Sequence, residues 1–83
     1  MLKYNIMKIF LRKLVNLNIW GGRHTDLKNL KKSLPKHLRG GKEAKEAIKE
    51  LIKIDFLILK KSTFEWHVSL NSHKQSEIYR FIN

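Results

Sequence analysis

Residues 47–61 read AIKELIKIDFLILKK, and the spacing of their apolar side chains changes at Asp55. Before Asp55 the apolar residues recur every three or four positions, which is typical of an amphipathic helix. Beyond it they form a short continuous run, and after the next turn residues 66–70 alternate between apolar and polar, as strands do. Aspartate also tolerates the left-handed conformation in which many helices end. The stretch therefore predicts a helix over residues 42–54 and a β-hairpin over residues 56–70.

The helix predicted over residues 42–54 has one apolar and one charged face. The apolar face carries Ala44, Ala47, Ile48, Leu51, Ile52 and Ile54. The opposite face carries Lys42, Lys45, Glu46, Lys49 and Lys53. An amphipathic helix of this kind buries the first face in a core and leaves the second in solvent.

On the N-terminal side, the same periodicity predicts helices over residues 2–17 and 26–34. Between them, Ile19-Trp20 is a short apolar step that fits one rung of a small sheet. Thr25 is the expected N-cap of the second helix. This helix must end before Pro35, because the residue preceding a proline is pushed out of the helical region. A turn around Leu38 then leads into Gly40-Gly41.

On the C-terminal side, residues 62–65 are expected to form the hairpin turn, and residues 73–82 a short last helix. Ser72, with a glutamine three residues later, matches a capping box at the start of that helix. Phe64 lies at the tip of the turn. We expect its ring to fold against the sheet, the alternative being an exposed ring that stacks or wedges. Both tryptophans are expected in the core, given their apolar neighbours.

Length and composition favour one small domain spanning residues 1–83. The 83 residues are 42% hydrophobic, which suffices for one core. The absence of cysteine excludes disulfides and a cysteine-ligated zinc site, and favours a reducing compartment. The apolar runs are too short for a transmembrane helix or a signal peptide. We therefore expect a cytoplasmic protein without a membrane partner.

No pattern in the chain predicts an enzyme, a cofactor, a small-molecule ligand or a metal site. The glycines occur as two isolated pairs instead of a phosphate-binding loop, and no nucleophile has an evident base. The histidines show no pair at helical i,i+4 spacing and no accompanying cysteine or paired carboxylate. They are His24, His37, His67 and His73.

Positive charge is the strongest compositional signal. The formal net charge is +11, from 18 lysines and arginines against 7 acidic residues. The densest excess lies in residues 23–42, which include the only proline and follow or contain each glycine pair. A charge of this size attracts a polyanion without any specific contact. Nucleic acid is therefore the expected partner.

Residues 25–71 resemble the winged helix-turn-helix family. Within them, residues 47–61 look like the end of a recognition helix that leads into the first wing strand. More loosely, three segments look like small archaeal proteins of this fold whose function is unassigned. They are WGGRHT (20–25), LPKHLR (34–39) and HVSLN (67–71). The resemblance implies a mainly α fold with a small β-hairpin, in which a three-helix core carries a wing and a C-terminal helix.

Proteins with a helix-turn-helix dock on duplex DNA with the second of its two helices in the major groove. The residues then expected to bind nucleic acid are Lys36, Arg39, Lys42, Lys45, Lys49, Lys53, Lys60 and Lys61. Base readout should be weak, because residues 42–54 contain no Arg, Asn or Gln. Such a protein would be a transcriptional regulator or an architectural factor.

Three alternatives stay open at this point. The charged face of residues 42–54 is also what a solvated helix with Glu46/Lys49 and Glu50/Lys53 pairs would show. The same fold and basic face could serve a protein- or RNA-interaction module. Finally, apolar residues left over on the two terminal helices predict self-association as a homodimer.

Overall fold

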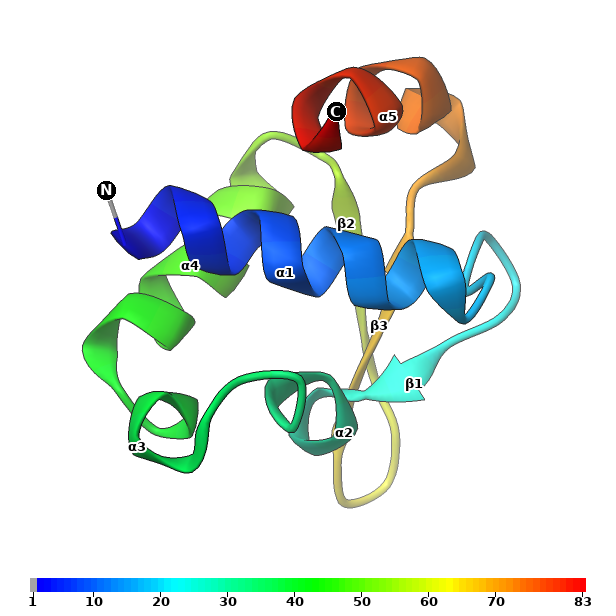
Figure 1. Ribbon diagram of the computed structural model, residues 1–83. Helices are drawn as coiled ribbons and strands as arrows, with labels where there is room; N and C mark the ends of the chain where they lie inside the picture. The colour runs from blue at the N-terminus through cyan, green and yellow to red at the C-terminus, as the bar shows by residue number, and fades with distance from the viewer. Residues whose placement is uncertain (1) are drawn as a thin grey trace.

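The computed structural model describes residues 2–83, and over this range the chain forms five α-helices and one three-stranded antiparallel sheet (Figure 1). The elements follow in the order α1 (Leu2–Asn16), β1 (Thr25–Asp26), α2 (Leu27–Lys31), α3 (Lys36–Arg39), α4 (Lys42–Lys53), β2 (Leu57–Lys61), β3 (Trp66–Leu70), the 3₁₀ turn η1 (Ser72–Lys74) and α5 (Gln75–Ile82). None of these helices has the length and apolar character needed to span a bilayer.

Strand β3 is the centre of the sheet, whose order is β1-β3-β2. It pairs with β2 along its whole length and with the two residues of β1. Trp20 adds a parallel bridge to Leu70. The Leu70 N–H donates to the Ile19 carbonyl at 2.9 Å, and the Gly21 N–H donates to the Leu70 carbonyl at 3.1 Å. The predicted rung at Ile19-Trp20 is therefore confirmed.

Helix α1 lies across one side of the molecule and packs mainly against α4 (Figure 1). The core brings together one face of α1, one face of α4 and the inner face of the hairpin. Its fully enclosed large side chains are Ile6, Met7, Phe10, Leu11, Leu14, Leu30, Leu34, Leu51, Val68, Leu70 and Ile78. Burial of this apolar surface is the main stabilising contribution to the fold.

Helix α5 closes the core instead of standing apart from it. Ile78 and Ile82 are buried, and the Phe56 and Phe81 rings meet edge to face with centroids 5.9 Å apart. The Arg12 guanidinium of α1 donates from Nη2 to the Ile82 carbonyl at 2.7 Å. Because the last carbonyls of a helix have no partner within it, this hydrogen bond caps α5 and ties it to α1.

Most of the predicted elements are confirmed, with shifts at their ends. The helix predicted over 42–54 and the hairpin predicted over 56–70 are α4 and β2–β3. Asp55 ends α4 with φ of +64°, and the Phe56 N–H donates back to the Leu51 carbonyl at 2.9 Å. This backbone geometry is the left-handed helix end that Asp55 was expected to supply.

Two predicted helix caps are wrong. Thr25 is taken up by the sheet, where it pairs with Val68, and Asp26 caps α2 through a hydrogen bond from the Asn29 N–H to Oδ1. Asn71, not Ser72, caps the C-terminal segment, because its Oδ1 accepts from the His73 N–H at 3.1 Å. In both cases the residue beside the expected one in sequence accepts the capping hydrogen bond, through its carboxylate or amide oxygen.

The region between α1 and α4 contains more separate helices and turns than predicted. Helix α2 ends at Lys31, and residues up to Leu34 continue as turns. The segment around Leu38, expected as a turn, is the short helix α3. Pro35 is its N-cap residue, with φ of −55° and ψ of 150°, and its carbonyl accepts a hydrogen bond from the Leu38 N–H at 2.9 Å.

Candidate nucleic-acid interface

Two parallel stripes of opposite charge run along the exposed side of α4. Lys42, Lys45, Lys49 and Lys53 follow one another at spacings of three and four, and all four are exposed. Glu43, Glu46 and Glu50 repeat at the same spacings directly beside them. Because a helix turns once in about 3.6 residues, each set keeps to its own line. We call the first set the lysine stripe.

The carboxylate stripe lies on the side of α4 that faces α1. Its member Glu50 accepts an ion pair from Lys3 of α1, with Nζ and Oε1 3.8 Å apart. No lysine of the lysine stripe forms an ion pair within residues 2–83. The pairs Glu46/Lys49 and Glu50/Lys53, which belong to the solvated-helix alternative, are not among the ion pairs of the described chain. The four side chains line one shallow hollow together with Lys3.

Arg39 was expected to contact phosphate, but the structure gives its side chain a role within the fold. Its guanidinium donates from Nε to the Leu34 carbonyl at 2.8 Å and from Nη2 to the Lys32 carbonyl at 3.2 Å. These carbonyls lie where α2 ends and the chain turns toward α3. Arg39 thus holds the α2–α3 connection with two of its five N–H groups.

Lys36 and the two hairpin lysines are exposed, as a phosphate contact requires. Lys36 begins α3, which leads directly into the N-terminal end of α4. Lys60 and Lys61 end β2, and β2 runs back toward the same lower edge of the molecule (Figure 1). Lys61 places Nζ 5.3 Å from the centroid of the Trp66 ring, within cation–π range.

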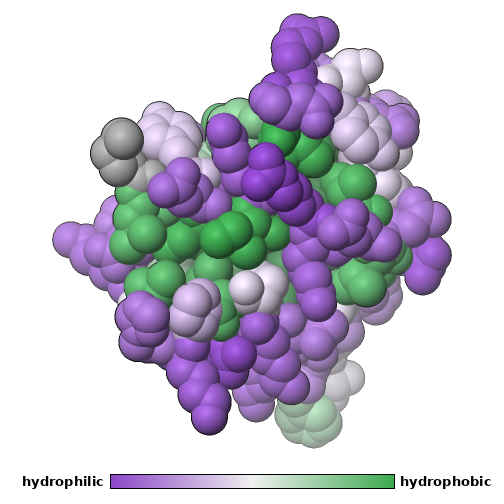
Figure 2. Space-filling model, viewed as in Figure 1, coloured by the Kyte–Doolittle hydropathy of each residue, from purple (hydrophilic) through white to green (hydrophobic). Residues whose placement is uncertain are grey.

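The two aromatic side chains near the hairpin turn are not in the core. Phe64 is 94% exposed, so the expectation that its ring folds against the sheet is wrong. Trp66 is 45% exposed, whereas Trp20 is half-buried against the core. The four-residue turn closes with a hydrogen bond from the Ser62 N–H to the Glu65 carbonyl, which carries Phe64 outward at the tip. Figure 2 shows an apolar group projecting where Figure 1 places this turn.

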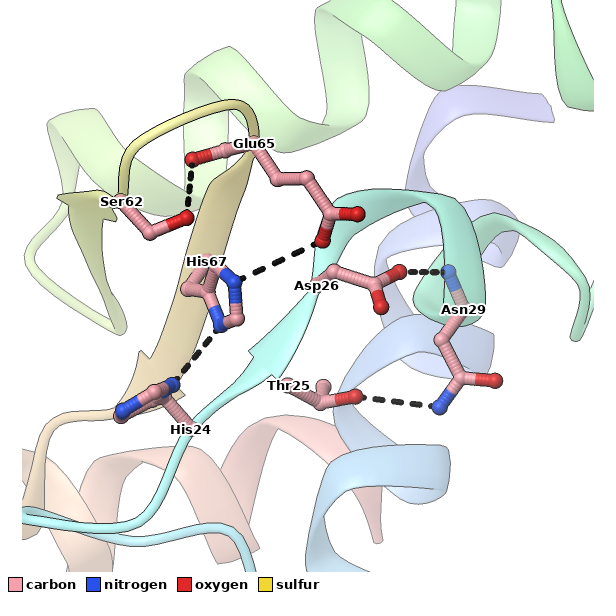
Figure 3. A network of polar contacts seen from close by, with 7 residues as sticks. All are labelled: His24, Thr25, Asp26, Asn29, Ser62, Glu65 and His67. Carbon is pink, nitrogen blue, oxygen red and sulfur yellow. Dashed lines mark hydrogen bonds and ion pairs between the residues drawn. The ribbon is translucent and has the colours of Figure 1, made fainter.

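A histidine pair, which the sequence pattern did not indicate, joins the residue before β1 to β3 (Figure 3). His24 and His67 lie 43 positions apart in sequence, and their Nδ1 atoms are 2.8 Å apart. One ring donates and the other accepts, and the tautomers decide which does which. Glu65 lies on the far side of His67, with Oε2 3.6 Å from Nε2. No group of three or more potential metal ligands occurs in the described residues.

The structure thus brings the predicted residues together only in part. Lys42, Lys45, Lys49 and Lys53 form one surface on α4, while Lys36, Lys60 and Lys61 lie on neighbouring elements and Arg39 is engaged in the fold. Comparison with protein-family models, with curated proteins and with solved structures finds no match for this chain.

Proposed function

We propose that this domain is a winged helix-turn-helix that binds duplex DNA with α4 in the major groove. Support for this fold comes from the order of the elements, in which helices α1 to α4 precede the hairpin, and from the small sheet with the order β1-β3-β2. The observation that carries the functional part is the lysine stripe: four exposed ammonium groups without a carboxylate partner in residues 2–83, on the helix that precedes the hairpin.

The proposed complex is held chiefly by phosphate contacts. Lysine is a flexible point charge, whereas sharp base readout depends on the planar groups of Arg, Asn or Gln, and α4 has none of these. Lys36 at one end of α4, and Lys60 and Lys61 on the hairpin, extend the positive surface beyond the helix. A protein of this kind would act as an architectural factor or as a regulator with weak base specificity.

The test compares two triple variants that remove the same charge from different faces. Lys42→Gln/Lys45→Gln/Lys49→Gln removes the lysine stripe's first three members, and Lys8→Gln/Lys13→Gln/Arg80→Gln removes three charges from α1 and α5. Both leave a formal net charge of +8, three below +11. Lys3 is kept in both because it is paired with Glu50.

Duplex DNA is titrated at several salt concentrations. The stripe variant should flatten the slope of log affinity against log salt by about 2 to 3, since each phosphate contact contributes about 0.9. The control variant should keep a slope near that of the unaltered protein. Equal losses in the two variants would mean diffuse attraction and would overturn docking of α4. Tighter binding to RNA than to duplex DNA would favour the interaction-module alternative.

A further inference from the structure

A groove separates the hairpin turn from the start of α2. It is open to solvent and has a volume of about 370 Å³. Its lining comes from β1 and α2, with Asp26, Leu27, Lys28 and Lys31, and from the hairpin, with Phe64, Glu65 and Trp66. This volume is within the range of roughly 300–1,000 Å³ found for small-ligand sites. The groove belongs to elements other than α4, so the lysine stripe is not part of it.

The groove has an aromatic wall that the fold itself does not use. Phe64 and Trp66 are 94% and 45% exposed, so neither ring is needed to close the core. Leu27, which packs partly against the core, is the apolar residue facing them in the lining. Exposed apolar side chains that gather around one hollow commonly mark a binding site. A flat, apolar-faced group fits such a wall best.

The groove lining carries two lysines and two carboxylates, which differ in their contacts within the fold. Asp26 is engaged as the cap of α2, and Glu65 faces His67 (Figure 3). By contrast, Lys28 and Lys31 form no ion pair within the described chain. The two carboxylates each have a contact within the fold, whereas the two ammonium groups have none. The phosphate of a ligand can therefore approach Lys28 and Lys31.

We propose that the groove binds an unpaired nucleotide of a single-stranded nucleic acid. Its base stacks on Phe64 and Trp66, and its phosphate lies against Lys28 and Lys31. Base stacking on aromatic side chains combined with lysine contacts to the backbone is the general chemistry of single-strand binding. An acidic peptide would satisfy the charge but offers no flat ring. The site goes beyond the proposed duplex contact and does not depend on α4.

Trp66 provides the reporter for the test. The chain has two tryptophans, and Trp20→Phe leaves Trp66 as the single source of tryptophan fluorescence. This variant is titrated with four probes of matched length: oligothymidylate, oligouridylate, an abasic deoxyribose-phosphate oligomer and polyglutamate. The two oligonucleotides should quench Trp66, and comparing them separates DNA from RNA as the source. The abasic oligomer and polyglutamate should bind weakly and leave the fluorescence unchanged.

Variants then locate the contact. On the Trp20→Phe background, Phe64→Ala should weaken oligothymidylate binding about tenfold, in line with the loss of one stacking partner. Tyr4→Ala is the matched control, because Tyr4 is also an exposed aromatic residue (54%) but lies on α1. It should leave the affinity unchanged. Lys28→Gln/Lys31→Gln should flatten the salt dependence by about 1 to 2.

Three outcomes would overturn the proposal. They are absence of quenching by both oligonucleotides, equal binding of the abasic oligomer or polyglutamate, and unchanged affinity in Phe64→Ala. Oligothymidylate quenching that survives in the variant lacking Lys42, Lys45 and Lys49 supports a separate site. Loss of the quenching there would assign single-strand binding to α4 and overturn the groove. Duplex binding without any quenching would overturn the groove and leave the proposed function standing.

Discussion

Arg39 shows how the chemistry of one residue can serve the fold where its charge suggests a ligand contact. Its two hydrogen bonds to carbonyls at the end of α2 are charge-assisted. We expect Arg39→Ala to lower the free energy of unfolding by about 1–3 kcal/mol, because the carbonyls lose a charged donor. Urea denaturation measures this change.

The matched variant is Lys36→Ala, at an exposed position on the same short helix. Its stability should change by less than about 0.5 kcal/mol, as at most surface positions. Its duplex affinity should fall, with a salt slope flatter by about 0.9. Similar stability of the two variants would contradict the role assigned to Arg39.

Residue-level expectations held where local chemistry decides the outcome. Asp55 adopts its left-handed backbone because the end of the helix pattern and the start of the strand pattern leave one position between them. Thr25 and Phe64 went against expectation for different reasons, the first through a distant partner and the second through its own turn. The competitor for Thr25 is β3, some forty residues away in sequence, and the exposure of Phe64 follows from a turn whose closure points the ring outward.

At the scale of elements, the hairpin offers a test separate from α4. Lys60→Gln/Lys61→Gln should flatten the salt dependence of duplex binding by up to about 2 if both ammonium groups contact phosphate. The thermal midpoint should change little, since both side chains are exposed. Because Lys61 also lies over Trp66, fluorescence of the Trp20→Phe background reports whether the ring has moved.

An unchanged salt slope in that hairpin variant, alongside a flattened one in the α4 variant, would confine the duplex contact to α4. A lowered thermal midpoint would instead indicate that the two lysines support the hairpin. The comparison therefore separates contact from stability for this element.

The long elements were predictable from sequence because their apolar spacing is a property of each segment alone. Helices α1 and α4 bury the faces that their spacing indicates, and the hairpin follows from the change of period. The short elements were not. Strand β1 has two residues and exists only because β3 lies beside it, and α3 is a single turn. The groove and the histidine pair join segments far apart in the chain, so no local pattern indicates them.

At the scale of the whole molecule, self-association through α1 and α5 stays a prediction. Helix α5 buries Ile78 and Ile82 in its own domain, which leaves Leu2, Ile9 and Tyr79 at 41%, 36% and 37% exposure. Apolar groups lie along α1 between polar ones (Figure 2). Sedimentation equilibrium should show a dimer at about tens of micromolar protein, because pairing covers this surface.

Ile9→Glu should dissociate that dimer, since it introduces a charge into the contact. Ile58→Glu is the control, because Ile58 is similarly exposed (38%) but lies on β2. A monomer mass for the unaltered protein would contradict the prediction, as would equal dissociation by both variants.

The separation of charge on α4 also has a kinetic consequence. Lysines on one line and glutamates on the next give the helix surface a dipole directed across its axis, in addition to the excess positive charge of the chain. In the field of a polyanion, such a dipole exerts a torque on the approaching molecule and turns the lysines forward before any contact forms. Fewer encounters then begin in the wrong orientation. The arrangement therefore acts on the rate of association more than on the lifetime of the complex.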